Sequence, residues 1–275
     1  MKKFIVFIVI VLAGFYYYLE HDLPEKPKRV IRVGVECAFA PNNWEEDKPS
    51  KTNVPLVNNP GFYADGYDIQ IAKQVAEDIG AELEVLKIDW NDLFDALNGR
   101  KIDVIFSGML DTEEREKIIA FTEPYEAQKI EYAVVVNKKS PYNQAKTFED
   151  LRGARLLAQS GTKLNDAIDQ IPGVVHITPV STVAVMLDNL INFRVDGIVI
   201  NLDTGQSYVR TYSNLTLIRF PEGQGFKLGF NGICAGVRKS DTKLLAELNE
   251  SIHKITAKDR LRIMDRAVAR TWENL

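Results

Sequence analysis

The chain has 275 residues, of which 45% are hydrophobic and 26% charged, a composition typical of a folded protein with a sizeable core. Its formal net charge is −4, and the lack of a basic cluster in the sequence argues against binding to nucleic acids or anionic membranes. The two cysteines, Cys37 and Cys234, stand in apolar runs. We expect them to be small buried core residues, with a disulfide formed after export as the alternative.

The amino-terminal residues have the pattern of an export signal. Two lysines precede an apolar run, Phe4–Leu19, which polar residues follow. The run is short for a membrane-spanning helix, but the tyrosines near its end suit a membrane interface. We expect residues 1–19 to be an uncleaved anchor and residues 20–29, rich in Pro and Lys, to be a tether. Cleavage after Ala13 is the alternative.

Residues 30–125 predict alternating strands and helices. Short β-rich apolar runs indicate strands, and apolar residues at helical spacing indicate amphipathic helices. The polar, Pro- and Asn-rich stretch 45–62 shows neither pattern and is expected to be a surface loop. The predicted strands are 30–35, 82–88 and 102–106, and the predicted helices are 67–79, 90–97 and a helix capped at Asp111 or Thr112 that runs towards Phe121.

The same alternation continues through the second half of the chain. It indicates α/β units with mostly parallel sheets. The predicted strands are 132–136, 155–158, 176–180, 196–200, 215–220 and 232–237, and the predicted helices are 162–171, 182–191, 242–255 and 259–269.

The turn at Ser107 and Gly108 follows a predicted buried strand and precedes the helix that carries Arg115. Ligands bind at the carboxyl ends of strands in open α/β sheets because loop amides and helix amino termini converge there. The planar guanidinium of Arg115 can bind a carboxylate at this edge. Arg115 alone is equally consistent with an ordinary solvated helix arginine.

Longer motifs support the binding interpretation. The run from Asp103 to Tyr125, DVIFSGMLDTEEREKIIAFTEPY, resembles the amino-acid-binding proteins of ABC importers, solute-binding protein family 3. GYDIQIA (66–72), WNDLFDAL (90–97) and NGRKIDV (98–104) extend the resemblance, and ECAFAPNNW (36–44) and AIDQIPGV (167–174) are most similar to glutamine-binding relatives of Gram-positive type. The resemblance covers roughly residues 30 to 270.

The resemblance implies an α/β, type II periplasmic-binding-protein fold with two lobes joined by two crossing strands. Lobe one would comprise residues 30–125 and 231–275, and lobe two residues 129–230. The ligand would lie in the cleft, and closure about the hinge would bury it.

The resemblance also assigns the ligand-binding residues. Arg115, the amides near Gly108 and Leu110, and the helix start at Gly161 and Thr162 would bind a carboxylate. Phe39 and Trp90 would enclose the ligand between their rings. Glu36, at the end of the first strand, would accept a hydrogen bond from an amide or a cationic group of the ligand. The full predicted set is Glu36, Phe39, Trp90, Ser107, Gly108, Leu110, Arg115, Gly161, Thr162 and Asn201.

Two positions depart from the family pattern. Leu110 stands where the family usually has a hydroxyl, and Asn201 where it usually has the acidic partner of the ligand's ammonium group. A lost counter-charge weakens ammonium binding unless Asp203 replaces it. Lys163 could add positive charge for a more acidic ligand. Either the ligand is not an ordinary α-amino acid, or the site has been rebuilt.

The leading hypothesis is therefore an exported, membrane-tethered, monomeric receptor that delivers a polar amino acid or close analogue to an ABC permease. We expect no catalytic residue, cofactor, metal or nucleic acid to be involved. One alternative is a dehydratase-like enzyme on the same scaffold, with Glu36, Glu131 or Asp203 as general acid, although the sequence shows no clear carboxylate–histidine pairing. The other alternative is a ligand-sensing ectodomain.

Overall fold

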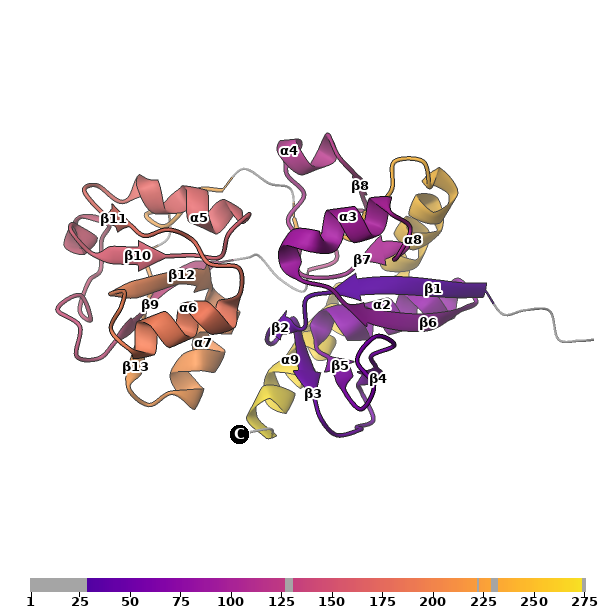
Figure 1. Ribbon diagram of the computed structural model, residues 1–275, viewed down its shortest axis with the longest axis horizontal. Coiled ribbons are helices and arrows are strands. Elements are labelled where there is room, and N and C mark those ends of the chain that lie inside the picture. The colour runs from indigo at the N-terminus through magenta and orange to yellow at the C-terminus, as the bar shows by residue number, and fades with distance from the viewer. Residues whose placement is uncertain (1–28, 127–130, 222, 229–231, 274–275) are drawn as a thin grey trace, which may run out of the picture.

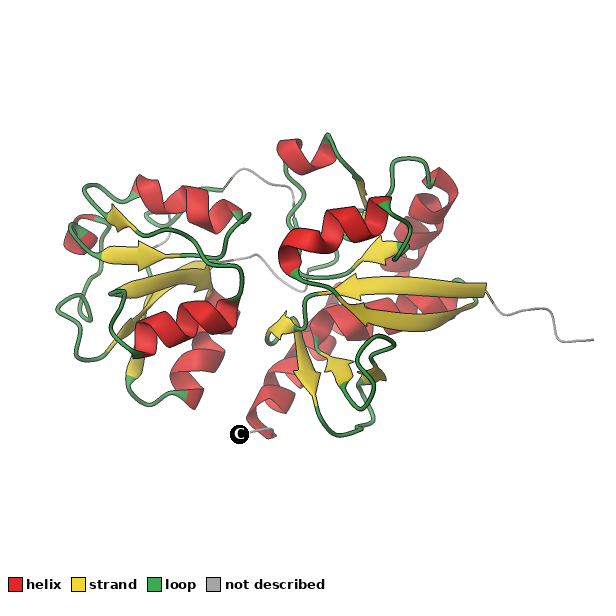
Figure 2. Cartoon of the chain, in the orientation of Figure 1, coloured by secondary structure: helices red, strands yellow, loops and turns green. Residues whose placement is uncertain are grey.

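The computed structural model describes residues 29–126, 131–221, 223–228 and 232–273. These residues form two α/β lobes that lie side by side (Figure 1). Helices pack on both faces of the large sheets (Figure 2). The predicted anchor and tether lie outside the described residues.

Lobe one comprises the first part of the described chain together with its last part. Its main sheet has the strand order β6-β1-β7-β14-β8, and a smaller sheet has the order β2-β3-β5-β4. Its elements are β1 (Arg29–Val35), β2 (Ala38–Phe39), β3 (Asn43–Glu46), β4 (Val54–Pro55), β5 (Tyr63–Asp65), α2 (Tyr67–Asp78), β6 (Ala81–Lys87), the 3-10 turn η1 (Trp90–Asp92), α3 (Leu93–Asn98), β7 (Val104–Ile105), α4 (Glu113–Glu116), β8 (Ala120–Phe121), β14 (Gly236–Val237), α8 (Thr242–Lys254) and α9 (Ala257–Glu273).

The main sheet of lobe one is buried on both faces, which explains the continuous apolar runs of its strands. Successive side chains point to opposite faces of a strand. Val104 and Phe106 accordingly pack among residues of α2, α8 and α9, whereas Ile105 packs with α3. The two hydrophobic layers fix the carboxyl ends of β1 and β7, where the candidate site lies.

Lobe two has a sheet of strand order β11-β10-β12-β9-β13. Its strands alternate in the same way, with Val199 packed on the α5 side and Ile200 on the α6 side. Its elements are β9 (Tyr132–Asn137), η2 (Glu149–Leu151), β10 (Arg155–Leu157), α5 (Lys163–Ala167), η3 (Ile168–Gln170), β11 (Val175–His176), α6 (Val183–Ile191), β12 (Gly197–Asn201), α7 (Leu202–Thr211) and β13 (Leu215–Ile218).

The chain passes from lobe one to lobe two after β8 and returns after β13. Two crossing strands were predicted to join the lobes, and segments 127–130 and 229–231, at the lobe boundaries, lie outside the described residues. Both sheets are mixed, because β9 pairs antiparallel with β12 and β13, and β14 pairs antiparallel with β7 and β8. Four of the five strands in each of these sheets nevertheless run in the same direction, so the expectation of mostly parallel sheets is confirmed for the main sheet of each lobe. β9 and β14 each begin next to a lobe change, so they run away from the cavity at which β12 and β7 end.

The prediction that residues 45–62 form a surface loop was wrong in part. Within and beside it, β3, β4 and β5 form most of the small sheet. These strands have only two to four residues, too few for an apolar alternation to be recognised. Tertiary interactions stabilise them: Arg270 of α9 pairs with Glu46 at 2.7 Å and with Asp65 at 3.2 Å.

Two helices differ from the sequence prediction. The helix predicted to run from Asp111 or Thr112 towards Phe121 has only four residues, α4, and its N-cap is Thr112, whose side chain accepts a hydrogen bond from the Arg115 N–H. Helix α7 was not predicted, because it buries small polar residues and a glycine instead of a broad apolar stripe. A Cβ on Gly205 would lie 2.6 Å from Leu217, so only glycine lets α7 approach the sheet this closely.

Cys37 and Cys234 are buried and free, which confirms their prediction as core residues. Burial raises the pKa of the Cys37 thiol to about 12, so it stays protonated at neutral pH. Within the described ranges, none of the helices combines the length and the apolar character that crossing a bilayer requires.

Candidate functional site

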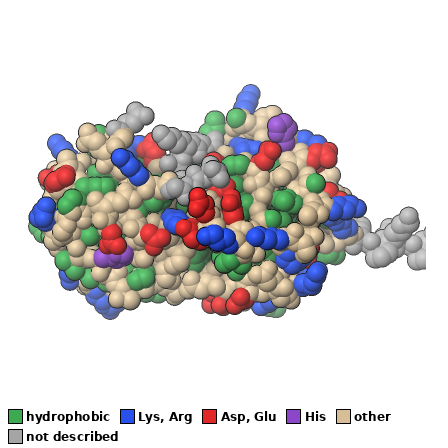
Figure 3. All heavy atoms as spheres, turned by 90° about the horizontal axis from the view of Figure 1, so that it is seen from above, with side chains coloured by type: hydrophobic (Ala, Val, Ile, Leu, Met, Phe, Trp, Pro, Cys, Tyr) green, Lys and Arg blue, Asp and Glu red, His purple; other side chains and the backbone are tan. Residues whose placement is uncertain are grey.

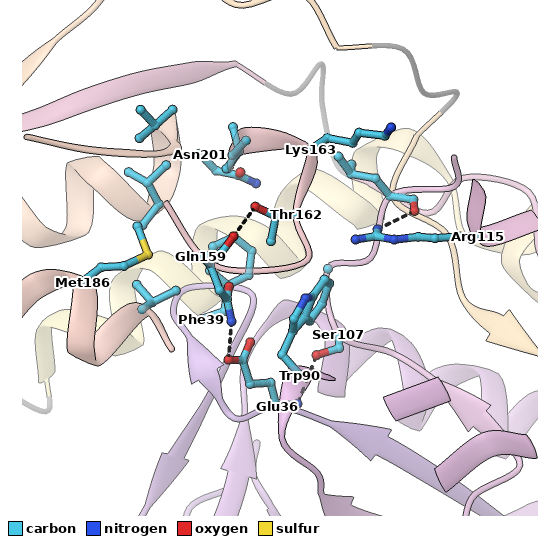
Figure 4. A pocket seen from close by; sticks show the side chains of 16 residues that line it. Glu36, Phe39, Trp90, Ser107, Arg115, Gln159, Thr162, Lys163, Met186 and Asn201 are labelled. Carbon is cyan, nitrogen blue, oxygen red and sulfur yellow. Dashed lines mark hydrogen bonds between the residues drawn. The ribbon is translucent and has the colours of Figure 1, made fainter. Parts of the chain in front are cut away.

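A cavity of about 50 Å³ lies between the lobes (Figure 4). Its lobe-one wall carries aromatic and polar groups from Glu36, Phe39, Trp90, Ser107, Gly108, Leu110 and Arg115. Its lobe-two wall is more apolar and consists of Gln159, Thr162, Lys163, Leu164, Val183, Met186, Val199, Ile200 and Asn201.

Strand ends position the polar residues of this cavity. Glu36 follows β1, Ser107 follows β7, Gln159 follows β10 and Asn201 ends β12. These four strands, two from each lobe, thus point their carboxyl ends at the cavity, the arrangement in which α/β proteins bind ligands. Gly108 has φ +61°, and a Cβ there would lie 3.1 Å from the Phe39 ring, so glycine lets the backbone turn beside the aromatic wall.

Arg115 is the buried cation of the site. Its side chain leaves α4 one residue after the acidic Glu114, and the residue is only 9% exposed. Nη1 donates to the Leu110 carbonyl at 2.7 Å, and Nη2 donates to the Gly161 carbonyl of lobe two at 2.8 Å. The guanidinium lies 5.3 Å from the centre of the Trp90 ring, a cation–π distance. Burial lowers its pKa to about 10, so it remains charged at neutral pH.

Glu36 and Gln159 join the lobes on the opposite side of the cavity. The Gln159 Nε2 donates to the Glu36 Oε1 at 2.6 Å and to the Ser181 carbonyl at 3.0 Å. Glu36 is 4% exposed, and its backbone N–H donates to the Ser107 Oγ at 3.0 Å. Burial raises the pKa of the carboxyl to about 7, and the hydrogen bond from Gln159 opposes that rise.

Further polar contacts cross the interface near the rim. Lys163 pairs with Glu114 at 2.9 Å, and the Asn91 Nδ2 donates to the Ser160 Oγ at 3.3 Å. Acidic and basic side chains gather where the lobes meet (Figure 3). They border an open groove of about 700 Å³ next to the cavity, lined by Asp111, Glu113, Glu114, Glu116, Lys163, Asp166, Ala167, Gln170, Lys227 and Leu228.

Asp68 is a buried carboxyl that contacts the Gly108 turn of the cavity wall. Asp68 of α2 is fully buried and accepts hydrogen bonds from the Tyr125 hydroxyl at 2.7 Å and the Asn43 side chain at 2.7 Å. A hydrogen bond from the Gly108 backbone also lowers its pKa, but burial outweighs these contacts and raises it to about 7. Asp68 thus ties the Gly108 turn to the core of lobe one.

The structure brings nearly all of the predicted site residues together. Of the ten, nine line the cavity, and Gly161 lies beside it with its carbonyl bonded to Arg115. Their contact with a ligand stays a prediction. Asp203 is not among the described residues that line the cavity, so the structure gives no support to its replacing an acidic group at Asn201.

Sequence reasoning missed Gln159 and the apolar lobe-two wall. Gln159 stands just past a predicted strand, so the strand-end rule that selected Ser107 could have selected it as well. Nothing in the sequence marks Met186 or Val183 as cavity residues, because helical core positions have the same apolar pattern.

A carboxylate–histidine pair, which the sequence did not reveal, lies away from the cavity. The His176 Nδ1 is 2.9 Å from Asp169, and its Nε2 is 2.9 Å from the Asn165 Oδ1. Neither His176 nor Asp169 lines the cavity. Glu131, a candidate acid for the enzyme alternative, pairs with Arg219 at 2.8 Å and is half exposed.

Comparisons with known proteins agree with this architecture. Residues 31–267 match the family model of bacterial extracellular solute-binding proteins, family 3. The chain is 32% identical over 197 residues to "ABC transporter arginine-binding protein 1" of Escherichia coli, covering 70% of this chain and 76% of that one. It is 26% identical over 244 residues to a "Probable histidine-binding protein" of Campylobacter jejuni, covering 84% and 87%.

A solved structure of the substrate-binding protein of an amino acid ABC transporter superposes with a TM-score of 0.72 at 26% identity, covering 89% of this chain and 99% of that one. The fold and site define a two-lobed periplasmic-type binding protein, which confirms the expected fold class. The chain belongs to family 3 of the bacterial extracellular solute-binding proteins. Its role is ligand binding and not catalysis, so the enzyme alternative is dropped.

Proposed function

We propose that this protein is the receptor of an ABC importer, in which the cavity between the lobes holds a polar amino acid or close analogue. The observation that carries the proposal is Arg115, a charged guanidinium buried at the lobe interface whose hydrogen-bond partners among the described residues are two backbone carbonyls. A buried cation without a directly bonded anion favours a carboxylate ligand. The names of the relatives support amino-acid import.

We further propose which residues of the cavity bind each part of the ligand. The carboxylate binds Arg115 and the amides near Gly108 and Leu110, together with the helix start at Gly161 and Thr162. Phe39 and Trp90 enclose the middle of the ligand. Glu36 faces the far end, where it accepts a hydrogen bond from an amide, or from a guanidinium of the kind an arginine-binding relative would hold.

We also propose how the whole chain is organised. Residues 30–125 with 231–275 move as one lobe and residues 129–230 as the other, and the protein acts as a monomer beside its permease. Residues 1–19 anchor it at the outer face of the cytoplasmic membrane, with 20–29 as the tether.

A thermal-shift screen of the full chain in mild detergent tests the ligand class. The screen covers amino acids, their amides and small carboxylates. A ligand at about 1,000 times its Kd stabilises the folded state by about 4 kcal/mol, which a melting curve detects readily. We expect a shift that Arg115→Ala abolishes and that Arg266→Ala, at an exposed position of α9, retains. No shift with any compound, or one that survives Arg115→Ala, would refute the proposed function.

A further inference from the structure

The ionisable groups of the cavity are unevenly placed. Among the described residues that line it, three are ionisable: Glu36, Arg115 and Lys163. Arg115 and Lys163 lie on one side, and Glu36 lies below Gln159, away from Asn201 (Figure 4). One side of the cavity therefore presents two cations, and the single carboxyl is at the other end.

The cations are not both neutralised inside the cavity. Lys163 pairs with Glu114. Glu114 and Asp166 also act electrostatically on Arg115, but both carboxylates line the open groove. Within the cavity, Arg115 bonds only to neutral carbonyls among the described residues. A ligand carboxylate is the group that this end lacks.

An α-amino acid carries its ammonium on the carbon that bears the carboxylate. When the carboxylate binds Arg115, the ammonium must lie close to this guanidinium, whose like charge repels it. Asn201, the polar side chain that β12 adds to the lobe-two wall, offers a neutral amide oxygen. A buried ammonium without a carboxylate partner is costly.

The rest of the lobe-two wall strengthens this asymmetry. Met186, Val199, Ile200 and Leu164 add apolar side chains to the same wall. Glu36 cannot serve as the missing partner, because it lies at the end of the cavity away from Asn201 (Figure 4). This end suits a methylene or another uncharged group next to the carboxylate.

Building on the proposed function, we propose that the cavity selects carboxylates that carry no ammonium group on the adjacent carbon. The far end of such a ligand carries an amide or guanidinium that faces Glu36. The chemical class is thus an ω-amido or ω-guanidino carboxylic acid. Asn201 is the residue that sets this preference.

Titration calorimetry of the full chain in mild detergent tests the proposal with two matched pairs of compounds. L-Arginine is compared with 5-guanidinopentanoate, and L-glutamine with glutaramate, so each pair differs only in the α-ammonium. A hydrogen-bonded charge pair changes affinity by about tenfold or more. We expect the compound without ammonium to bind at least about tenfold more tightly in at least one pair.

Asn201→Asp provides the second measurement. It should reduce that preference by about tenfold or more, mainly through tighter binding of the α-amino acid. Asn214→Asp, at an exposed position before β13, should leave the preference unchanged. If the α-amino acid of each pair binds wild type as tightly as its partner or more tightly, this inference is wrong although the receptor function stands. If none of the four compounds binds, the proposed ligand class falls, and this inference falls with it.

Discussion

Glu36→Gln should change how the stability of the protein depends on pH. The substitution keeps the shape of the side chain and an oxygen that accepts the hydrogen bond from Gln159, but it removes the titratable proton. Glu36 is 4% exposed, so its charge is poorly solvated in the folded protein. A pH-dependent difference between variant and wild type therefore isolates this carboxyl.

The sign follows from the two pKa values. The carboxyl ionises near 4.5 when solvated, and burial raises its pKa to about 7 in the folded protein. The folded state thus binds more protons between these values, so the stability that Glu36 contributes is fully present below pH 4.5 and is lost as the pH rises through 7. At about 1.4 kcal/mol per pKa unit, the ionised form costs about 3 kcal/mol at high pH.

Thermal unfolding of both proteins between about pH 5 and 8.5 measures this effect. We expect Glu36→Gln to melt close to wild type at the low end and roughly 6–12 °C higher at the high end. Asp68 has a raised pKa in the same range, but it is present in both proteins and cancels in the comparison. Glu82→Gln, at an exposed position of β6, is the matched control and should show no such difference. A difference between Glu36→Gln and wild type that does not change with pH would refute the reasoning.

Two further substitutions test other parts of the structure. Gln159→Leu removes the donor that joins lobe two to Glu36, so at about pH 8 it should weaken binding of the best ligand about tenfold or more; an unchanged Kd by calorimetry would show that the contact does not contribute to closure. Gly66→Ala should destabilise the protein by about 2 kcal/mol or more in urea unfolding, because φ is +122° and the new Cβ would lie 2.3 Å from the Asn42 carbonyl oxygen. Gly80→Ala also has a positive φ but meets no atom within 4 Å, so it should cost less, and equal losses would contradict the role assigned to the clash.

Much of the architecture could be predicted from local patterns. Apolar runs such as 102–106 identify strands buried on two faces, since such strands are apolar at successive positions and rich in β-branched residues. Ser107, just past β7, followed from the strand-end rule. Glu36 and Asn201 also stand at strand ends, but they were assigned through the family resemblance.

Other features depend on residues far apart in the chain. The small sheet forms because Arg270 of α9 pairs with Glu46 and Asp65, and α7 packs against the sheet because Gly205 lies against Leu217. A short polar strand or a helix without an apolar stripe has no local signature, since its stability comes from tertiary contacts.

The sequence, through its patterns and its family resemblance, predicted the two-lobed α/β class and assigned Arg115, Glu36 and Asn201 to the cleft between the lobes. Only the tertiary structure decided which groups meet. It paired Glu36 with Gln159, kept Asp203 out of the residues described as lining the cavity and placed Arg115 and Lys163 on one side, away from Glu36. Local sequence determines where a side chain stands on its own helix or strand. The groups that it contacts across the cavity belong to the other lobe, and only the folded chain brings them together. The balance of charge in the cavity is therefore a property of the folded chain.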